Sequence, residues 1–131
     1  MNKQLTLKDF PEIKNVVEYF ESQEKLRKNK ERCLNNYAVQ IRKICDEHGF
    51  NWNVKNPKDI ATLLLLMHSE ISEATEALRD EKYEEVKLEI IGLIIRALHL
   101  LQLLNTDIDK LLQFEIIRNQ SRPYKHGRKL F

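Results

Sequence analysis

Two apolar stretches of the chain, residues 63–74 and 85–99, are each interrupted by acidic side chains. The apolar residues of the first stretch recur three and four positions apart, the spacing of one helical face, and this stripe comprises Leu63, Met67, Ile71, Ala74 and Leu78. Before it, Asn56 is followed by a proline, which together are a typical helix start. The pattern therefore predicts one helix that ends at about Arg79 and a second over about 82–104.

Amphipathic spacing also predicts helices on either side of this pair. The helix before it has its apolar face over residues 34–45 and ends near Gly49, because glycine commonly terminates helices. After the pair, Thr106 and Asp109 resemble a capping box in its acidic variant. They predict a last helix that runs to about Gln120.

The whole chain is expected to be all-α. It has 131 residues, which favour one domain, and only three glycines and three prolines interrupt its helical periods. We separate an N-terminal helical extension, residues 1–30, from the main helical domain, residues 31–131. The extension is predicted to contain an extra amphipathic helix that begins at Pro11.

Acidic side chains lie where the two central helices are otherwise apolar. Glu70 falls on the shoulder of the first apolar stripe, and Glu73 lies one turn further round. In the second helix one polar stripe contains Glu85, Glu89, Gly92, Arg96 and His99. A carboxylate near a core is costly unless it is paired or holds a metal. We interpret the two helices as facing each other around a cation site, whose oxygen ligands suit Mg²⁺.

The same spacing allows a simpler explanation. Two packed helices can bury a carboxylate against Arg96 as an ion pair, and Glu-rich helix faces are commonly solvated. For Glu70, Glu73 and Glu89, spacing alone does not decide between ion pairing and metal binding. We interpret His99 as a hydrogen-bonded core histidine rather than a ligand, because Mg²⁺ prefers oxygen.

Two motifs, taken in order, resemble a known family. Glu70-x-x-Glu73, fifteen intervening residues and Glu89-x-x-Gly92 are similar to the Glu-x-x-Glu, Glu-x-x-Asp signature of the MazG-like all-α nucleoside triphosphate pyrophosphohydrolases. Residues 119–127, Asn-Gln-Ser-Arg-Pro-Tyr-Lys-His-Gly, are similar to the Asn-x-x-Arg-Pro-Tyr-x-His-Gly ending of many small members. The resemblance covers roughly residues 32–131. It implies a MazG-like four-helix bundle and an assembly of two or four chains.

The resemblance also implies an activity. Such a protein converts a nucleoside triphosphate to a nucleoside monophosphate and pyrophosphate with Mg²⁺, or Mn²⁺ in its place. Glu70, Glu73 and Glu89 would be its metal ligands and catalytic residues. Its substrate-binding residues would be Trp52, Asn119, Arg122, Lys125 and His126. Arginine and lysine suit phosphate oxygens, and Trp52 would either stack on a base or close the end of the bundle as an aromatic plug.

The chain departs from the family pattern at two positions. Gly92 stands where the family has an aspartate ligand, and Glu115 stands where many relatives have a lysine. Glu85, one turn before Glu89, is a candidate substitute ligand. The alternatives to an enzyme impaired by Gly92 are an inactive nucleotide-binding or regulatory protein of the same fold and a structural helical module.

Composition bears on three further classes of protein, namely those that bind nucleic acid, those that span membranes and those with cysteine metal sites. The formal net charge of +2 is too small to argue for nucleic-acid binding, so we expect none. No apolar run reaches the length of a membrane span, and Cys33 and Cys45 have no metal-site spacing. We therefore expect a cytoplasmic protein with reduced thiols and no membrane contact.

Overall fold

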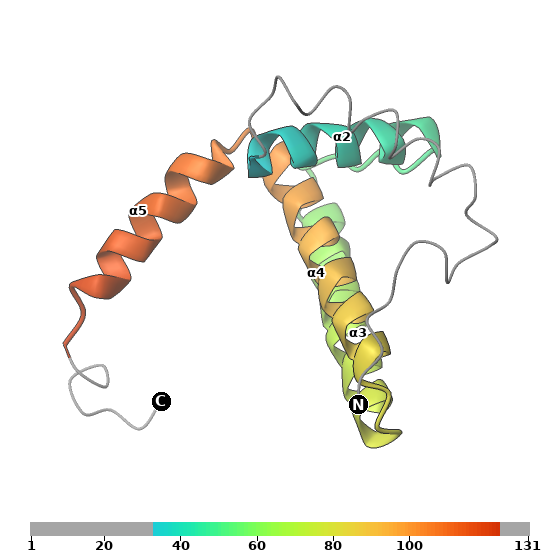
Figure 1. The fold of residues 1–131 in the computed structure, drawn as a ribbon. Helices are drawn as coiled ribbons and strands as arrows, with labels where there is room; N and C mark the ends of the chain where they lie inside the picture. Colours follow the sequence, from blue (N-terminus) through green and yellow to red (C-terminus); the bar gives the residue numbers. More distant parts are fainter. Residues whose placement is uncertain (1–32, 124–131) are drawn as a thin grey trace, which may run out of the picture.

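The computed structural model describes residues 33–123, and these form four helices (Figure 1). They are α2 (Leu34–Glu47), α3 (Pro57–Arg79), α4 (Tyr83–Leu103) and α5 (Ile108–Gln120). No strand occurs in this range, so the all-α prediction is confirmed there. The helix predicted to begin at Pro11 lies outside the described residues.

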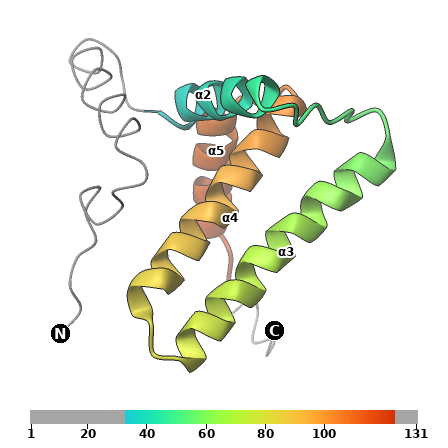
Figure 2. The ribbon, with the colours of Figure 1, turned by 90° about the vertical axis from the view of Figure 1, so that its right-hand side faces the viewer.

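The hairpin of α3 and α4 is the centre of the arrangement. The two helices run antiparallel, and α2 crosses the end of the hairpin where α4 finishes (Figures 1 and 2). Helix α2 packs on α4, whereas α5 contacts α2 and α4 but not α3. Within one chain, the four helices therefore do not close into a bundle.

The start of α3 forms as its sequence predicts. The Asn56 side chain accepts a hydrogen bond from the Lys58 amide at 3.1 Å, and Pro57 occupies the first turn. Asp59 accepts the Asn53 amide at 2.8 Å, which ties the preceding loop to this first turn. The polar loop and the helix start consequently form one hydrogen-bonded unit.

Three helices end in the same way. A residue with positive φ follows the C-cap of α2, α3 and α4, and these residues are Gly49 (82°), Glu81 (58°) and Asn105 (53°). At the end of α3, for example, the Lys82 amide donates to the Ala77 carbonyl at 2.9 Å. This is the pattern of a Schellman motif, which satisfies carbonyls that the helix leaves open.

The first turns of α2 and α5 cap each other. Asp109 accepts hydrogen bonds from the amides of Leu34 and Asn35 at 2.9 and 3.0 Å. In return, the Asn35 side chain accepts the Ile108 amide at 2.7 Å and donates to Asp107 at 2.9 Å. Two helix starts more than 70 residues apart thus satisfy each other's free amides.

The predicted cap of α5 is wrong by one residue. Its N-cap is Asp107, whose side chain accepts the Lys110 amide, rather than Thr106. Thr106 instead belongs to the end of α4, because its amide donates to the Leu101 carbonyl. Asp109, the expected partner in the capping box, is used by α2.

The buried residues gather where α2 crosses the hairpin. One cluster joins α2, α4 and α5 and comprises Ala38, Leu98 and Ile108. A second joins α3 and α4 and comprises Leu63, Leu100 and Leu103, against which Trp52 packs from the loop before α3. The core therefore fixes the C-terminal half of α4 more firmly than the turn end of the hairpin.

Large apolar side chains remain exposed along α3, α4 and α5 in the described part. Among the most exposed are Leu65, Ile91, Phe114 and Ile117. No helix of this part combines the length and the apolar character needed to cross a membrane.

Candidate metal site

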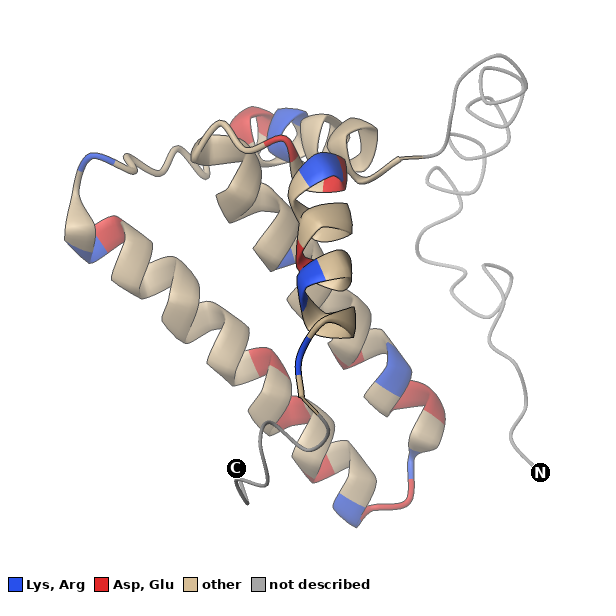
Figure 3. Cartoon of the chain, turned by 90° about the vertical axis from the view of Figure 1, so that its left-hand side faces the viewer, with Lys and Arg blue, Asp and Glu red and all other residues tan. Residues whose placement is uncertain are grey.

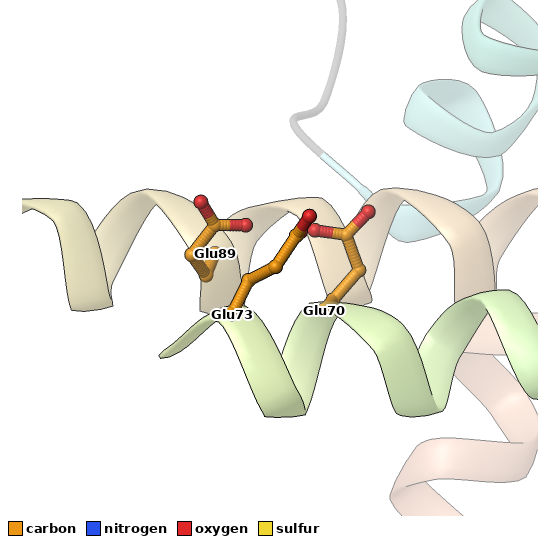
Figure 4. Close-up of side chains that lie close together, drawn as sticks. All are labelled: Glu70, Glu73 and Glu89. Atoms are coloured by element: carbon orange, nitrogen blue, oxygen red, sulfur yellow. The ribbon is translucent and has the colours of Figure 1, made fainter. Parts of the chain in front are cut away.

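Three carboxylates converge where α3 faces α4. Glu70 and Glu73 come from α3 and Glu89 comes from α4, and one oxygen of each lies within 4.8 Å of the others (Figure 4). Glu70 is buried, Glu89 is half-buried and Glu73 is exposed. The exposure of the three carboxylates therefore increases from Glu70 in the hairpin interior to Glu73 at the surface.

The hairpin brings these residues together because of their distance from its turn. After Lys58 and Asp59 in its first turn, α3 carries no charged residue until Glu70, and its remaining acidic residues lie toward the hairpin turn (Figure 3). Glu70 lies opposite Gly92, since a β-carbon at residue 92 would be 2.7 Å from Glu70 Oε2. Glu73, one turn later in α3, then meets Glu89, one turn earlier in α4.

Arg96 holds the buried member of the cluster. Its Nε donates a hydrogen bond to Glu70 Oε1 at 2.5 Å. This bond keeps the pKa of Glu70 below its ordinary value. The ion pair expected as an alternative to metal binding is thus present, and Glu70 belongs to it and to the carboxylate cluster together.

Glu89 has the opposite electrostatic environment. Its pKa is raised to about 6, mainly because protonated Glu89 donates a hydrogen bond to Glu70. Burial and the negative charge of Glu73 raise the pKa further. The cluster therefore carries more negative charge than Arg96 offsets, and a divalent cation would relieve it. Mg²⁺ and Mn²⁺ prefer carboxylate oxygens, so Glu70, Glu73 and Glu89 are the residues that would hold such a cation.

A cavity of about 480 Å³ adjoins the cluster. Phe50 and Trp52 line it from the loop before α3, and Glu70, Arg96 and His99 contribute polar groups. Its other lining residues are Cys45, Leu63, Leu66, Gly92 and Ile95. A mostly apolar hollow with a few convergent polar groups is typical of small-molecule sites.

His99 is the most buried polar residue of this cavity. It is 4% exposed, and its Nε2 has no hydrogen-bond partner among the described residues. Burial lowers its pKa, so the neutral imidazole is favoured. His99 is a core residue, as predicted, but the hydrogen bond expected of it is not present at Nε2.

Glu85, Asn119 and Arg122, three further predicted site residues, lie apart from the cluster. Glu85 is exposed and pairs with Lys82 at 3.6 Å, so the structure does not bring this candidate ligand to the carboxylates. Asn119 and Arg122 are exposed at the end of α5, which does not contact α3. Lys125 and His126 lie outside the described residues.

A mid-helix glycine at residue 92 has two explanations from sequence, close helix packing or a lost metal ligand. In the structure it provides the space that the Glu70 carboxylate occupies, and the sequence did not predict that Glu70 is the side chain that fills this space. The available signal was that Glu70 and Gly92 are equally far along the chain from Glu81, in the turn between the two helices. The contribution of Phe50 and Cys45 to the cavity depends on where α2 crosses α4, which no local pattern indicates.

Comparison with known proteins does not identify the chain. No model of a protein family, no protein of described function and no solved structure matches it. The resemblance drawn from its motifs therefore stands on those residues alone.

Proposed function

We propose that this chain is a Mg²⁺-dependent nucleoside triphosphate pyrophosphohydrolase that releases a nucleoside monophosphate and pyrophosphate. The observation that carries the proposal is the convergence of Glu70, Glu73 and Glu89 from two facing helices. Two further features support it. The spacing of the three glutamates resembles the MazG-like signature, and a cavity adjoins the cluster.

The chain's own residues would have distinct tasks in this reaction. Glu70, Glu73 and Glu89 would hold the cation, and the exposed Glu73 is best placed to orient an incoming water. Bound Mg²⁺ neutralises phosphate charge and lowers the pKa of a coordinated water. A water oriented by Glu73 would add its oxygen to the α-phosphorus and give up a proton to solvent, while the bond from the α-phosphorus to the bridging oxygen breaks and pyrophosphate leaves.

The cavity would receive the nucleoside. Phe50 and Trp52 present aromatic surface to it, and the free Nε2 of His99 offers one hydrogen bond to a base or sugar. Trp52 also packs on the core, so the plug and the base-stacking interpretations of this residue are compatible.

We further propose that two or four copies assemble. Exposed apolar side chains on α3 and α4 need a partner, and α5 of one copy would bring Asn119 and Arg122 to the site of another. Lys125 and His126 follow these residues directly and would add phosphate contacts.

Pyrophosphate release from a panel of ribo- and deoxynucleoside triphosphates with Mg²⁺ or Mn²⁺ tests the activity. Glu73→Gln should lower the rate about 100-fold or more, because it removes a ligand carboxylate while retaining shape. Glu76→Gln is the matched control, since it removes an exposed carboxylate from the same helix outside the cluster. Equal rates for the two variants would contradict the assignment.

A second candidate is a nucleotide-binding protein without turnover. The Glu70–Arg96 pair favours it, because this pair occupies a carboxylate that the chemistry needs. Gly92→Asp separates the candidates. Its β-carbon would displace Glu70 from Arg96 and its carboxylate would supply a fourth oxygen ligand. Pyrophosphate release only in Gly92→Asp would identify a binding protein whose catalysis is blocked at this position.

A further inference from the structure

Arg96 is the only Lys or Arg among the residues that line the cavity. In the described part of the chain its hydrogen-bond partner is Glu70, to which its Nε donates at 2.5 Å. The Arg96 side chain is 37% exposed, whereas that of Glu70 is 11% exposed. The arginine therefore has room to move toward the cavity, while the carboxylate stays within the hairpin.

The pairing depends on the glycine opposite. Glu70 Oε2 lies 2.7 Å from where a β-carbon at residue 92 would be. Any larger residue there would push the carboxylate away from its position beside Arg96. In this chain, Gly92 consequently permits an ion pair at the point where a fourth carboxylate would otherwise stand.

Arg96 and a divalent cation compete for the same carboxylate. Oε1 of Glu70 accepts from Arg96, and Glu70 also supplies an oxygen to the three-carboxylate cluster. A cation attracts both oxygens and repels the guanidinium, so its binding weakens the Arg96 hydrogen bond. A freed guanidinium beside the cavity is then a bidentate donor suited to phosphate oxygens.

We infer that Arg96 exchanges partners during ligand binding, pairing with Glu70 in the cation-free protein and with a phosphate group once a cation occupies the carboxylates. This inference rests on the proposed function, which supplies the cation and the phosphates. It makes Arg96 a substrate-positioning residue and predicts that the preferred ligand is a cation–polyphosphate complex.

Cooperativity follows from the exchange. The cation releases Arg96 for the phosphates, and the phosphates in turn remove a competitor of the cation. Each ligand therefore raises the affinity of the other by the same factor.

Isothermal titration calorimetry of the full chain tests whether Arg96 exchanges partners. With Mn²⁺ alone, Arg96→Met should bind about tenfold more tightly than the wild type, because Glu70 has lost its competing partner. With saturating Mn²⁺, an α,β-methylene deoxynucleoside triphosphate should bind Arg96→Met about tenfold more weakly, because one phosphate contact is gone. These opposite changes are the expected result.

A double variant separates exchange from simple charge removal. In a Glu70→Gln background, Arg96→Met should no longer tighten Mn²⁺ binding, since there is no carboxylate to release. An undiminished gain in that background would overturn the inference, as would unchanged affinity for the nucleotide analogue. Arg79→Met is the matched control, because it removes an exposed arginine at the turn end of α3, outside the cluster and the cavity lining, and should alter neither affinity.

The two proposals fail in different ways. If the wild type binds Mn²⁺ and Arg96→Met binds it equally well, the exchange is overturned and the metal site remains. If neither protein binds Mn²⁺, the metal site is overturned and the exchange with it. Circular dichroism monitors folding, and Arg96→Gln, which keeps a polar side chain, should shift both affinities in the same directions if Arg96→Met does not fold.

Discussion

Glu70 and Glu89 lie in one carboxylate cluster, yet their pKa values move in opposite directions. Arg96 stabilises the charged form of Glu70, whereas the neighbouring carboxylates destabilise that of Glu89. Without a divalent cation, the cluster therefore contains one carboxylate that resists protonation, Glu70, and one that takes a proton as the pH falls toward 6, Glu89.

This difference predicts how stability changes with pH. The pKa of Glu89 is about 6 in the folded protein, above its ordinary value of 4.5, so the folded state binds the proton more tightly. Stability from this group is present below pH 4.5 and is lost as the pH rises through 6. In EDTA, Glu89→Gln should therefore gain melting temperature relative to the wild type between pH 4.5 and 7.

Thermal melts across this pH range measure the effect. Glu76→Gln provides the comparison, because it removes an exposed carboxylate that lies outside the cluster. The difference in melting temperature between Glu76→Gln and the wild type should stay constant across the range. A constant difference for Glu89→Gln as well would show that the neighbouring carboxylates do not raise the pKa of Glu89.

At the residue scale, the sequence predicted that carboxylates would cluster but not the partners of each glutamate. Helical spacing placed Glu70 and Glu73 on one edge, and the hairpin matched them to Gly92 and Glu89. Glu85 shares the helical stripe of Glu89, but it lies one turn nearer the start of α4 and is exposed. Its salt bridge with Lys82 is local, so nothing draws it toward the cation site.

At the scale of the helices, local signals predicted most boundaries. Asn56 and Pro57 placed the start of α3 correctly, and Gly49 follows the end of α2 as expected. The start of α5 was misjudged because two residues competed for the cap. Asp107 prevailed since Asn35, distant in sequence, fixes the first turn of α5 through the Ile108 amide.

The shared cap of α2 and α5 makes a prediction about stability. Asn35→Ala removes one acceptor and one donor, and it leaves the Ile108 amide without its partner. The free energy of unfolding should fall by about 1 to 2 kcal/mol. Urea unfolding followed by circular dichroism measures this change.

Asn51→Ala is the control for this variant. Asn51 is exposed in the loop after α2, so its replacement should change the free energy of unfolding by less than about 0.5 kcal/mol. If Asn35→Ala proved equally mild, the contact between the two helix starts would contribute nothing to stability.

At the scale of the whole molecule, the other described helices cover one end of the hairpin and leave much of its length bare. Helix α2 and the two buried clusters occupy the end where α4 finishes, while Leu65 and Ile91 are more than half exposed. The bundle implied by the family resemblance needs helices from elsewhere. The sequence could not place them, since its apolar stripes specify that a face is buried but not by which chain.

The exposed faces predict self-association. Light scattering coupled to size-exclusion chromatography should give the full chain the molar mass of a dimer or tetramer. Leu65→Gln with Ile91→Gln should shift it toward the monomer, because these changes remove apolar contact area while keeping good helix formers. Lys58→Gln, at the exposed start of α3, should leave the assembly unchanged. A wild type that remains monomeric at every concentration would contradict the assembly.

The contact between the starts of α2 and α5 also bears on how the protein folds. The amides of Leu34, Asn35 and Ile108 gain their side-chain partners only when residues more than 70 positions apart have met. Closing so long a loop carries an entropic cost before the contact contributes. Opening either helix start also exposes the other, so the first-turn amides of α2 and α5 should exchange with deuterium at matched rates, as one cooperative unit.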